Sequence, residues 1–175
     1  MSKTKKEDDK PKVSRFAVAL LVLVAIGAIW LICVAIPRVK SLCPRMVCAT
    51  NLSGLGKSML IYAHENDGEY PTPSEWCDLL LQHTDVQDKH LRCYANKKER
   101  CSYAMNPNCE LNSPNDVVLL FETKGGWNQF GGAELLTTEN HKRKGCNILF
   151  NDGHVEFVTP EAIGQLNWGK SQGSR

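Results

Sequence analysis

The sequence predicts an α+β protein in which a long N-terminal helix, apolar at first and amphipathic further on, packs on a small antiparallel β-sheet. Three observations predict this fold. Residues 16–36 form an uncharged apolar run, residues 46–66 place apolar side chains at three- and four-residue steps, and residues 146–158 hold two short apolar runs around Asn-Asp-Gly. The 175 residues are enough for one globular domain beside such a helix.

The apolar run, FAVALLVLVAIGAIWLICVAI, has the length of a transmembrane helix. At about 1.5 Å per residue it spans roughly the 30 Å hydrocarbon core of a bilayer. A cleaved signal peptide is the alternative, but the apolar part of such a peptide is usually only about 7–15 residues long. More lysines and arginines precede the run than closely follow it. We therefore expect residues 1–15 to be a disordered cytoplasmic tail and the domain to be extracytoplasmic.

Residues 37–45 follow as a linker, in which Pro37 and Pro44 predict a kink or a short break of the helix. The amphipathic helix over residues 46–66 then presents one apolar stripe. The stripe consists of Cys48, Leu52, Leu55, Met59, Tyr62 and Ala63. An Asn-Asp-Gly turn and two prolines after this segment end the helix.

Short helices, loops and strands are expected in the rest of the domain, which we place at residues 46–168. A helix capped by Ser74 should turn three apolar side chains inward. They are Trp76, Leu79 and Leu80. Four segments have the composition of strands, namely residues 101–105, 116–123, 146–150 and 154–158. Residues 124–145 should form a long glycine-rich excursion that leaves room for a small motif of its own, and within it residues 125–132 should be a flexible loop. A last short helix should follow Thr159, and residues 169–175 should form a flexible tail.

A tight turn is predicted between the last two strands. Its residues are Asn151, Asp152 and Gly153. Aspartate and glycine accept the positive φ that a short hairpin turn requires. Because the turn fixes the register, His154 and Glu156 should face solvent, while Phe157 should be buried with Ile148 or Phe150.

Cysteines are numerous, with eight in the chain and seven of them beyond the apolar run. An oxidising compartment would allow disulfides. Proximity in sequence favours two pairs, Cys77–Cys93 and Cys101–Cys109. Connectivity cannot be deduced from the sequence, and Cys48 or Cys146 could replace either partner. Because the cysteines form no C-x2-C pairs, a zinc site is not expected.

Two stretches resemble bacterial pilins and pseudopilins. CATNLSGLGKSMLIYAHENDGEYP is similar to the segment in which type II secretion pseudopilins, including the major G-like ones, carry a helix that ends in Tyr, Asp-Gly and Tyr-Pro. The corresponding residues are Tyr62, Asp67, Gly68, Tyr70 and Pro71. The segment from His141 to Asp152-Gly153 resembles the carboxyl-terminal signature of a pseudopilin-like family, H-x9-DG, with ten intervening residues here.

The resemblance implies a pilin-like fold and a membrane-anchored structural or assembly protein, linked to type II secretion or pilus-like machinery and not an enzyme. It implies an inner (cytoplasmic) membrane, a periplasmic or other extracytoplasmic domain, and protein partners from such an assembly, a second copy of the chain among them. Pilins enter filaments after a peptidase cuts before the phenylalanine that starts the membrane helix. Because KVSRFAVALLVLV lacks both the glycine before Phe16 and a glutamate in the helix, we expect the anchor to remain uncleaved.

A membrane-tethered, metal-dependent hydrolase is the alternative, with His141, Asp152 and His154 as ligands and Glu156 as a fourth. On a strand, however, His154 and Glu156 share one face while Asp152 belongs to the turn, and no H-E-x-x-H spacing is present. We therefore interpret these residues as the solvent side of a hairpin. The sequence predicts no catalytic, cofactor-binding or metal-binding residue, and His141→Gln should cost little.

Partners other than the membrane are indicated by few residues. Trp127 and Phe130 lie in GGWNQFGG, which lacks the lysine of a phosphate-binding loop, and they form a candidate partner patch. Major pseudopilins hold calcium in a carboxyl-terminal loop, but this sequence has no matching run of acidic residues, so calcium is a lesser alternative and no other cofactor is predicted. A net charge of +2 is too small to indicate nucleic acid.

Overall fold

The computed structural model describes residues 15–94, 96 and 99–169, and for residues 34–43 it describes the backbone alone. The chain divides into two compact units, Met1–Lys40 and Ser41–Arg175. The predicted tails, residues 1–15 and 169–175, lie outside the described residues except for Arg15 and Gly169.

Helix α1 covers Arg15–Glu65. Its stretch Arg15–Cys33 has a mean hydropathy of 2.9 and is not buried by the protein, so its length and composition suit a membrane span or a signal sequence. The break predicted at residues 37–45 is wrong, because the backbone stays helical through Pro37 and Pro44. A proline removes one backbone donor, and a long helix can continue around that lost hydrogen bond.

The second unit contains a four-stranded antiparallel sheet with the strand order β1-β2-β3-β4. The strands are β1 (Tyr103–Met105), β2 (Val118–Glu122), β3 (Cys146–Phe150) and β4 (Val155–Val158). The helices beside α1 are α2 (Trp76–His83) and the short 3-10 helices η1 (Asp88–Leu91), η2 (Ala133–Leu135), η3 (Glu139–His141) and η4 (Ile163–Gln165). All four strands confirm segments predicted from apolar runs, and the chain is mixed α+β as expected.

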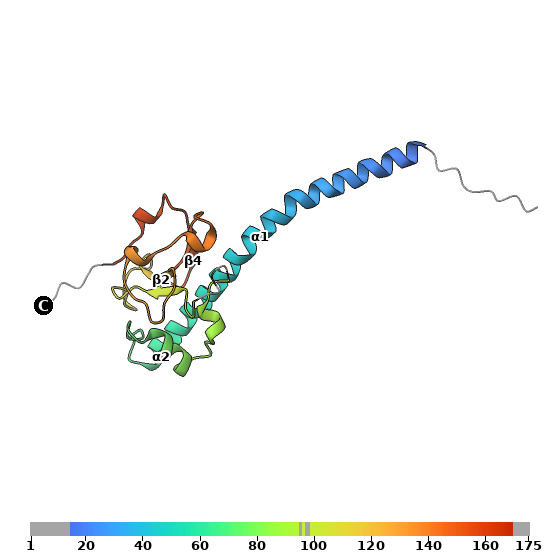
Figure 1. The fold of residues 1–175 in the computed structure, drawn as a ribbon. Coiled ribbons are helices and arrows are strands. Elements are labelled where there is room, and N and C mark those ends of the chain that lie inside the picture. Colours follow the sequence, from blue (N-terminus) through green and yellow to red (C-terminus); the bar gives the residue numbers. More distant parts are fainter. Residues whose placement is uncertain (1–14, 95, 97–98, 170–175) are drawn as a thin grey trace, which may run out of the picture. The chain divides into compact units, whose positions relative to one another are not determined.

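One face of the sheet packs against the part of α1 that belongs to this unit (Figure 1). Five residues of the predicted stripe are fully buried, namely Cys48, Leu52, Leu55, Met59 and Ala63, whereas Tyr62 is half-buried. A Cβ atom at Gly56 would lie 2.9 Å from Leu149 Cδ1, so the glycine allows β3 to approach the helix closely. Each large side chain buried here contributes about 1.5–3 kcal/mol before conformational entropy is counted. The predicted packing of helix on sheet is confirmed.

The opposite face of the sheet is also covered. Phe121 and Ile148 lie in a second apolar cluster, against which Leu136, Ile163 and Trp168 pack. Because both faces are covered, β3 is buried along its whole length and shows no alternation. The helix predicted after Thr159 is only one 3-10 turn, η4.

Phe157 does not lie where the sequence placed it. It pairs with Asn147, whereas Ile148 pairs with Glu156, so Phe157 shares the sheet face that looks toward α1. There it is half-buried, and the Arg45 guanidinium lies 3.6 Å from its ring centroid. The predicted burial of Phe157 with Ile148 or Phe150 is therefore wrong.

Residues 125–132 pack against the rest of the domain, contrary to the flexible loop that was expected there. The Trp76 indole donates to Gln129 O at 3.0 Å, and the Cys77 amide donates to Asn128 Oδ1 at 2.8 Å. These bonds attach α2 to the loop. The helix begins at Trp76 with Glu75 at its N-cap position, so the predicted cap by Ser74 is wrong. Of the three side chains expected to point inward, Leu79 is only half-buried.

The β3–β4 turn contains three residues. The Phe150 amide donates to His154 O at 3.0 Å, and the Gly153 amide donates to Phe150 O at 2.9 Å. Within the turn, Gly153 has a φ of +86°, and Asp152 is not among the described residues with positive φ, so that expectation is wrong. Asp152 instead accepts a 3.0 Å hydrogen bond from the His154 amide. The structural role of the turn is as predicted, with the glycine alone in the left-handed region.

Candidate functional site

The residues of the predicted hydrolase alternative are not brought together. Asp152 and His154 are hydrogen-bonded to each other at the exposed turn, and Glu156 is exposed on β4. His141 is buried at the end of η3. Among the described residues, a single group of three or more potential metal ligands lies within mutual reach, and it contains His141 without Asp152 or His154.

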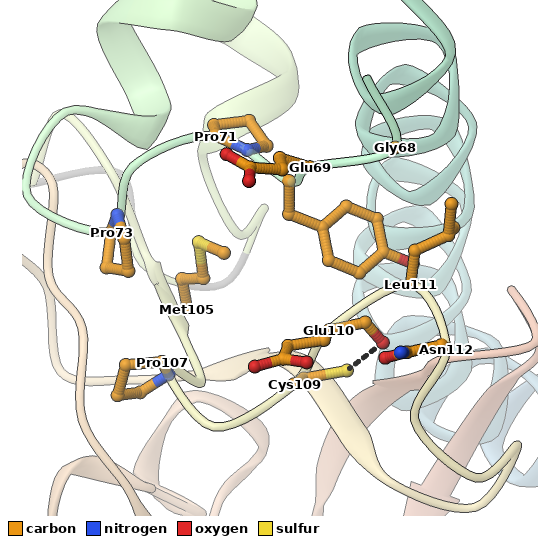
Figure 2. Close-up of a pocket in the computed structure, with 11 residues that line it drawn as sticks. Gly68, Glu69, Pro71, Pro73, Met105, Pro107, Cys109, Glu110, Leu111 and Asn112 are labelled. Carbon is orange, nitrogen blue, oxygen red and sulfur yellow. Dashed lines mark hydrogen bonds between the residues drawn. The ribbon is translucent and has the colours of Figure 1, made fainter. Parts of the chain in front are cut away.

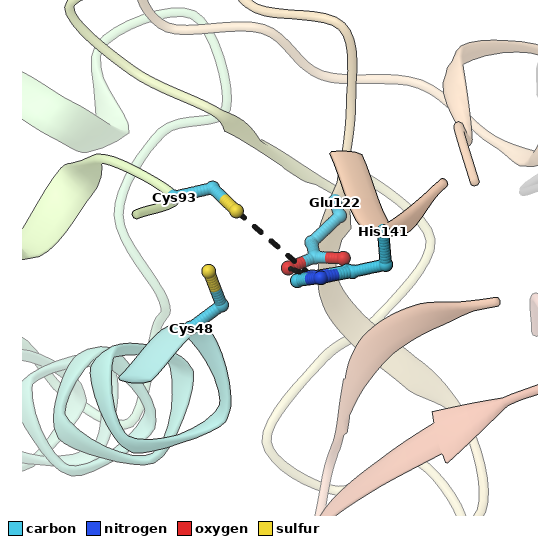
Figure 3. A group of neighbouring side chains, drawn as sticks. All are labelled: Cys48, Cys93, Glu122 and His141. Atoms are coloured by element: carbon cyan, nitrogen blue, oxygen red, sulfur yellow. Dashed lines mark hydrogen bonds and ion pairs between the residues drawn. The ribbon is translucent and has the colours of Figure 1, made fainter. Parts of the chain in front are cut away.

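That group is a buried cluster of four side chains, drawn in Figure 3. We call it the Cys–Glu–His cluster, and it consists of Cys48, Cys93, Glu122 and His141. One ligand atom from each residue lies within 4.8 Å of every other. Cys48, Cys93 and Glu122 have no exposed surface, and His141 is 8 % exposed.

Four separate elements supply the cluster. Cys48 is the first residue of the apolar stripe on α1, and Cys93 follows η1. Glu122 is the last residue of β2 and lies two positions after Leu120, so it faces α1 as that leucine does. His141 is the last residue of η3. In Figure 3 the side chains from these elements converge on a common point.

The carboxylate of Glu122 is held on several sides. His141 Nε2 lies 2.9 Å from Glu122 Oε1, which also accepts a 3.1 Å hydrogen bond from Asn147 Nδ2. The backbone amide of Asn147 donates to Glu122 Oε2 at 3.0 Å. A charge buried in this way is stable only with such partners.

The two thiols are positioned by the loop that follows η1. Cys93 Sγ lies 3.9 Å from His141 Nε2, and the backbone amide of the next residue, Tyr94, donates to Cys48 Sγ at 3.2 Å. Asn51 Nδ2 donates to Arg92 O at 3.0 Å, which attaches this loop to α1 one turn beyond Cys48. The same loop thus supplies one thiol and orients the other.

Electrostatics inside the cluster favours charged forms. The Cys93 hydrogen bond lowers the pKa of Cys48 to about 6, with help from His141 and against the effect of burial. Burial alone would lower the pKa of His141, but its contacts with Cys48 and Glu122 outweigh burial and raise the pKa to about 9. The two shifts favour a charged sulfur beside a charged imidazole, and a thiolate is both a nucleophile and a metal ligand.

The burial of Cys48 favours one of its two possible roles, nucleophile or metal ligand, over the other. A nucleophilic cysteine must be reached by its substrate, and Cys48 has no exposed surface. A pocket of about 580 Å³ is lined by Cys93 together with Val47, Asn51 and Arg92, although neither Cys48 nor Cys93 has exposed surface. The arrangement is therefore suited to holding an ion inside the protein.

The predicted disulfide pairs are not the pairs that the structure brings together. Cys93 belongs to the Cys–Glu–His cluster, and Cys77 Sγ lies 3.8 Å from Cys101 Sγ. Cys109 donates to Asn151 Oδ1 at 3.3 Å. None of the seven described cysteines is joined to another by a disulfide. The structure brings Cys77 and Cys101 together in place of Cys77–Cys93 and Cys101–Cys109, because α2 and the segment before β1 meet in the core.

The two residues of the candidate partner patch, Trp127 and Phe130, differ in their contacts and exposure. The Trp127 indole donates to both carboxylate oxygens of Asp78, at 3.0 and 3.1 Å, and the Arg100 guanidinium lies 3.6 Å from its ring centroid. Trp127 is therefore engaged within the domain, whereas Phe130 is 48 % exposed. Only Phe130 retains the exposure that the prediction required.

A second pocket lies between the end of the first stretch that carries the pseudopilin resemblance and residues 105–112 (Figure 2). Its volume is about 580 Å³, and it is lined by prolines and apolar side chains that include Pro71, Pro107 and Leu111. Beside it, the Tyr70 hydroxyl donates to Asn151 Oδ1 at 2.9 Å. Burial raises the pKa of Tyr70 to about 12, so the hydroxyl stays protonated and remains a donor. The helix-ending stretch and the hairpin turn are thus in direct contact.

The comparisons with known proteins give no match to this chain among protein-family models, curated proteins or solved structures. The site must therefore be interpreted from its own chemistry. The sequence analysis selected His141 but not the three residues around it. One of these, Glu122, could have been suspected, because it is the charged last residue of the apolar run VVLLFE, which forms a fully buried strand.

Proposed function

We propose that this chain is a membrane-anchored, pseudopilin-like structural or assembly protein and not an enzyme. The observation that carries the proposal is α1, which begins as an uncharged apolar helix and, within Ser41–Arg175, presents the stripe that packs on the antiparallel sheet. The apolar part is the anchor, with the basic N-terminal residues in the cytoplasm and the domain in the periplasm or another extracytoplasmic space.

The contacts between the two motif stretches support the pseudopilin-like assignment. Cys48 begins the first stretch and lies against His141, which begins the second. Tyr70 near the end of the first stretch bonds Asn151 near the end of the second. The two stretches therefore act as one structural unit, although many residues separate them in the sequence.

A structural role is also favoured by the distribution of reactive groups. The Cys–Glu–His cluster is buried, and the exposed Asp152–His154 pair has no third ligand in reach among the described residues. Hydrolysis needs a ligand or nucleophile that substrate can contact. The partners we propose are the membrane and proteins of a secretion or pilus-like assembly, which would include further copies of this chain and would contact Phe130.

Membrane fractionation with a topology reporter tests the proposal. We expect the full-length chain in the membrane fraction, extractable only by detergent, with a reporter fused after residue 175 active outside the cytoplasm. A Leu23→Arg, Ile26→Arg double variant should leave the membrane fraction, whereas Leu60→Arg on the domain part of α1 should stay. A wild-type chain that is soluble, or whose reporter faces the cytoplasm, would contradict the proposal.

Intact mass separates a permanent anchor from a processed one. We expect the mature chain to keep residues 1–15. A chain that begins at Phe16 would show that a pilin-type peptidase acts here and would favour incorporation into a filament. Cross-linking in mild detergent should then identify neighbours, and Phe130→Ala should lose them while Leu111→Ala, which also changes an exposed apolar side chain, should not.

A further inference from the structure

We propose that the Cys–Glu–His cluster is a structural zinc(II) site. Two thiol sulfurs, one imidazole nitrogen and one carboxylate oxygen converge there, and each comes from a different segment of the chain. The proposal concerns the domain alone and does not depend on the membrane-assembly function.

The spacing of the four ligand atoms matches a tetrahedron around zinc. Bonds of about 2.3 Å to sulfur and about 2.0–2.1 Å to nitrogen and oxygen place the ligand atoms of such a site roughly 3.3–3.8 Å apart. In the structure His141 Nε2 lies 2.9 Å from Glu122 Oε1 and 3.9 Å from Cys93 Sγ, and all four ligand atoms lie within 4.8 Å of one another. Adjustments of a few tenths of an ångström to one ångström would bring all four atoms to bonding distance.

The neighbours of the ligands are those that a metal site needs. Asn147 contacts both oxygens of Glu122 and so fixes the direction of the carboxylate. The Tyr94 amide donates to Cys48 Sγ, a bond that stabilises a thiolate. Both contacts leave the ligand atoms directed at the common point, which is where the ion would lie.

The ligand set selects the ion and its role. Two thiolates with an imidazole and a carboxylate suit zinc, which accepts sulfur, nitrogen and oxygen ligands in tetrahedral geometry, better than calcium or magnesium, which require oxygen. Four protein ligands leave no position for water or substrate, and the site is buried, so the zinc would be structural.

A Cys48–Cys93 disulfide is the competing arrangement for the two thiols. It would need neither a histidine nor a carboxylate, and it would leave Glu122 buried beside an apolar sulfur bridge. Zinc uses all four groups and offsets the negative charges of the thiolates and the carboxylate. The presence of His141 and Glu122 at the same point therefore favours the ion.

Metal analysis of the full-length protein in detergent tests the proposal. The protein would be purified through a tag that binds no metal, without chelator, and zinc would be measured by mass spectrometry. We expect one zinc per chain. Growth with cobalt should give a protein with the visible absorption of tetrahedral cobalt and the near-ultraviolet bands of cobalt–thiolate bonds.

Variants locate the ion. Cys93→Ser and Glu122→Gln should reduce the zinc content at least tenfold, whereas Cys109→Ser and His154→Gln, which change a buried thiol and a histidine outside the cluster, should retain one zinc per chain. If a ligand variant fails to fold, the wild-type metal content and the cobalt spectrum still decide. Folded wild-type protein with no more zinc than Cys93→Ser, or with Cys48 and Cys93 joined by a disulfide in unreduced peptide maps, would overturn the proposal.

Discussion

Two pairs of buried cysteines lie in the same domain and have different surroundings. Cys48 and Cys93 share their site with His141 and Glu122. Cys77 and Cys101 lie 3.8 Å apart in the apolar core, where the Cys101 thiol also contacts the Tyr103 carbonyl at 3.4 Å. The first pair therefore has two ionisable side chains beside it. The contacts given for the second pair join the two thiols to each other and to a backbone carbonyl.

Because both pairs are buried, their neighbours are what distinguishes their chemistry. In each pair a hydrogen bond between the two thiols lowers the pKa of one of them, that of Cys48 to about 6 and that of Cys101 below its ordinary value, but only Cys48 also has an imidazole beside it. Two cysteines beside nitrogen and oxygen ligands have the composition of a metal site. Two cysteines in an apolar core, without such ligands, have one reaction available in an oxidising compartment, which is to form a disulfide.

The largest expected effect is the loss of the core that holds both pairs. Leu55→Asp places a carboxylate at a fully buried position on α1, which should cost at least about 4 kcal/mol and unfold the domain. Thiol labelling should then reach both pairs at the same rate. Leu60→Asp, at a position on α1 that is 40 % exposed, should leave the domain folded and both pairs protected. Unchanged protection in Leu55→Asp would contradict the packing of α1 on the sheet.

The next effect distinguishes the pairs by oxidation. We expect Cys77 and Cys101, which are 24 positions apart, to form a disulfide in an oxidising compartment. Closing a loop of this length should stabilise the domain by about 3 kcal/mol in the chain-entropy model. Peptide mapping without reduction should find this bond and no Cys48–Cys93 bond. A domain whose Cys77 and Cys101 remain labelled as free thiols after passage through that compartment would refute the pairing.

Much of the fold follows from periodicity and turn chemistry. The α1 stripe and the strands β2, β3 and β4 were predictable because each is a local pattern of apolar side chains. Local patterns do not specify which face of a covered sheet a residue takes, which is why Phe157 was placed on the wrong side. A kink or break was predicted at Pro37 and Pro44 because a proline usually interrupts a helix. The helix that continues through both prolines was therefore not predicted.

The candidate site was less predictable, since its ligands come from four elements with no fixed spacing. Rules for zinc sites rest on short repeats such as C-x2-C, and here the thiols are joined only by tertiary structure. His141 was noticed for its distance from Asp152-Gly153. The structure gives that distance a different meaning: the Asp-Gly turn sets the β3–β4 register, and β3 carries Asn147 to Glu122.

A third prediction separates the two histidines of the second motif stretch. His141→Gln removes a buried ring that contacts Glu122 at 2.9 Å, which should cost about 2–3 kcal/mol because a buried carboxylate loses its partner. His154→Gln, at an exposed position, should stay within about 0.5 kcal/mol of wild type. Chemical denaturation of the detergent-purified chain measures both. Equal effects would mean that His141 has no more structural weight than a surface residue, as the sequence had suggested.

The smallest expected effect comes from a substitution at Gly153. It should destabilise the segments that hold Cys48 and Cys93 but not those that hold Cys77 and Cys101. Gly153 has a φ of +86° with open space around it, so Gly153→Ala adds left-handed strain without a clash and should cost about 1 kcal/mol. The cost falls on the β3–β4 hairpin, which positions Asn147 and through it Glu122. Pulsed alkylation should therefore label Cys48 and Cys93 roughly fivefold faster than in wild type, which is what about 1 kcal/mol corresponds to.

Under reducing conditions, the labelling of Cys77 and Cys101 should hardly change in the same variant, because these residues contact α2 and β1 and not the hairpin turn. Gly164→Ala is the matched control, since its added Cβ also meets open space and its φ is not in the left-handed region. If Gly153→Ala accelerated both pairs equally, the hairpin and the core around α2 would open as one cooperative unit. The two cysteine pairs would then differ in their chemistry alone and not in the stability of the segments that hold them.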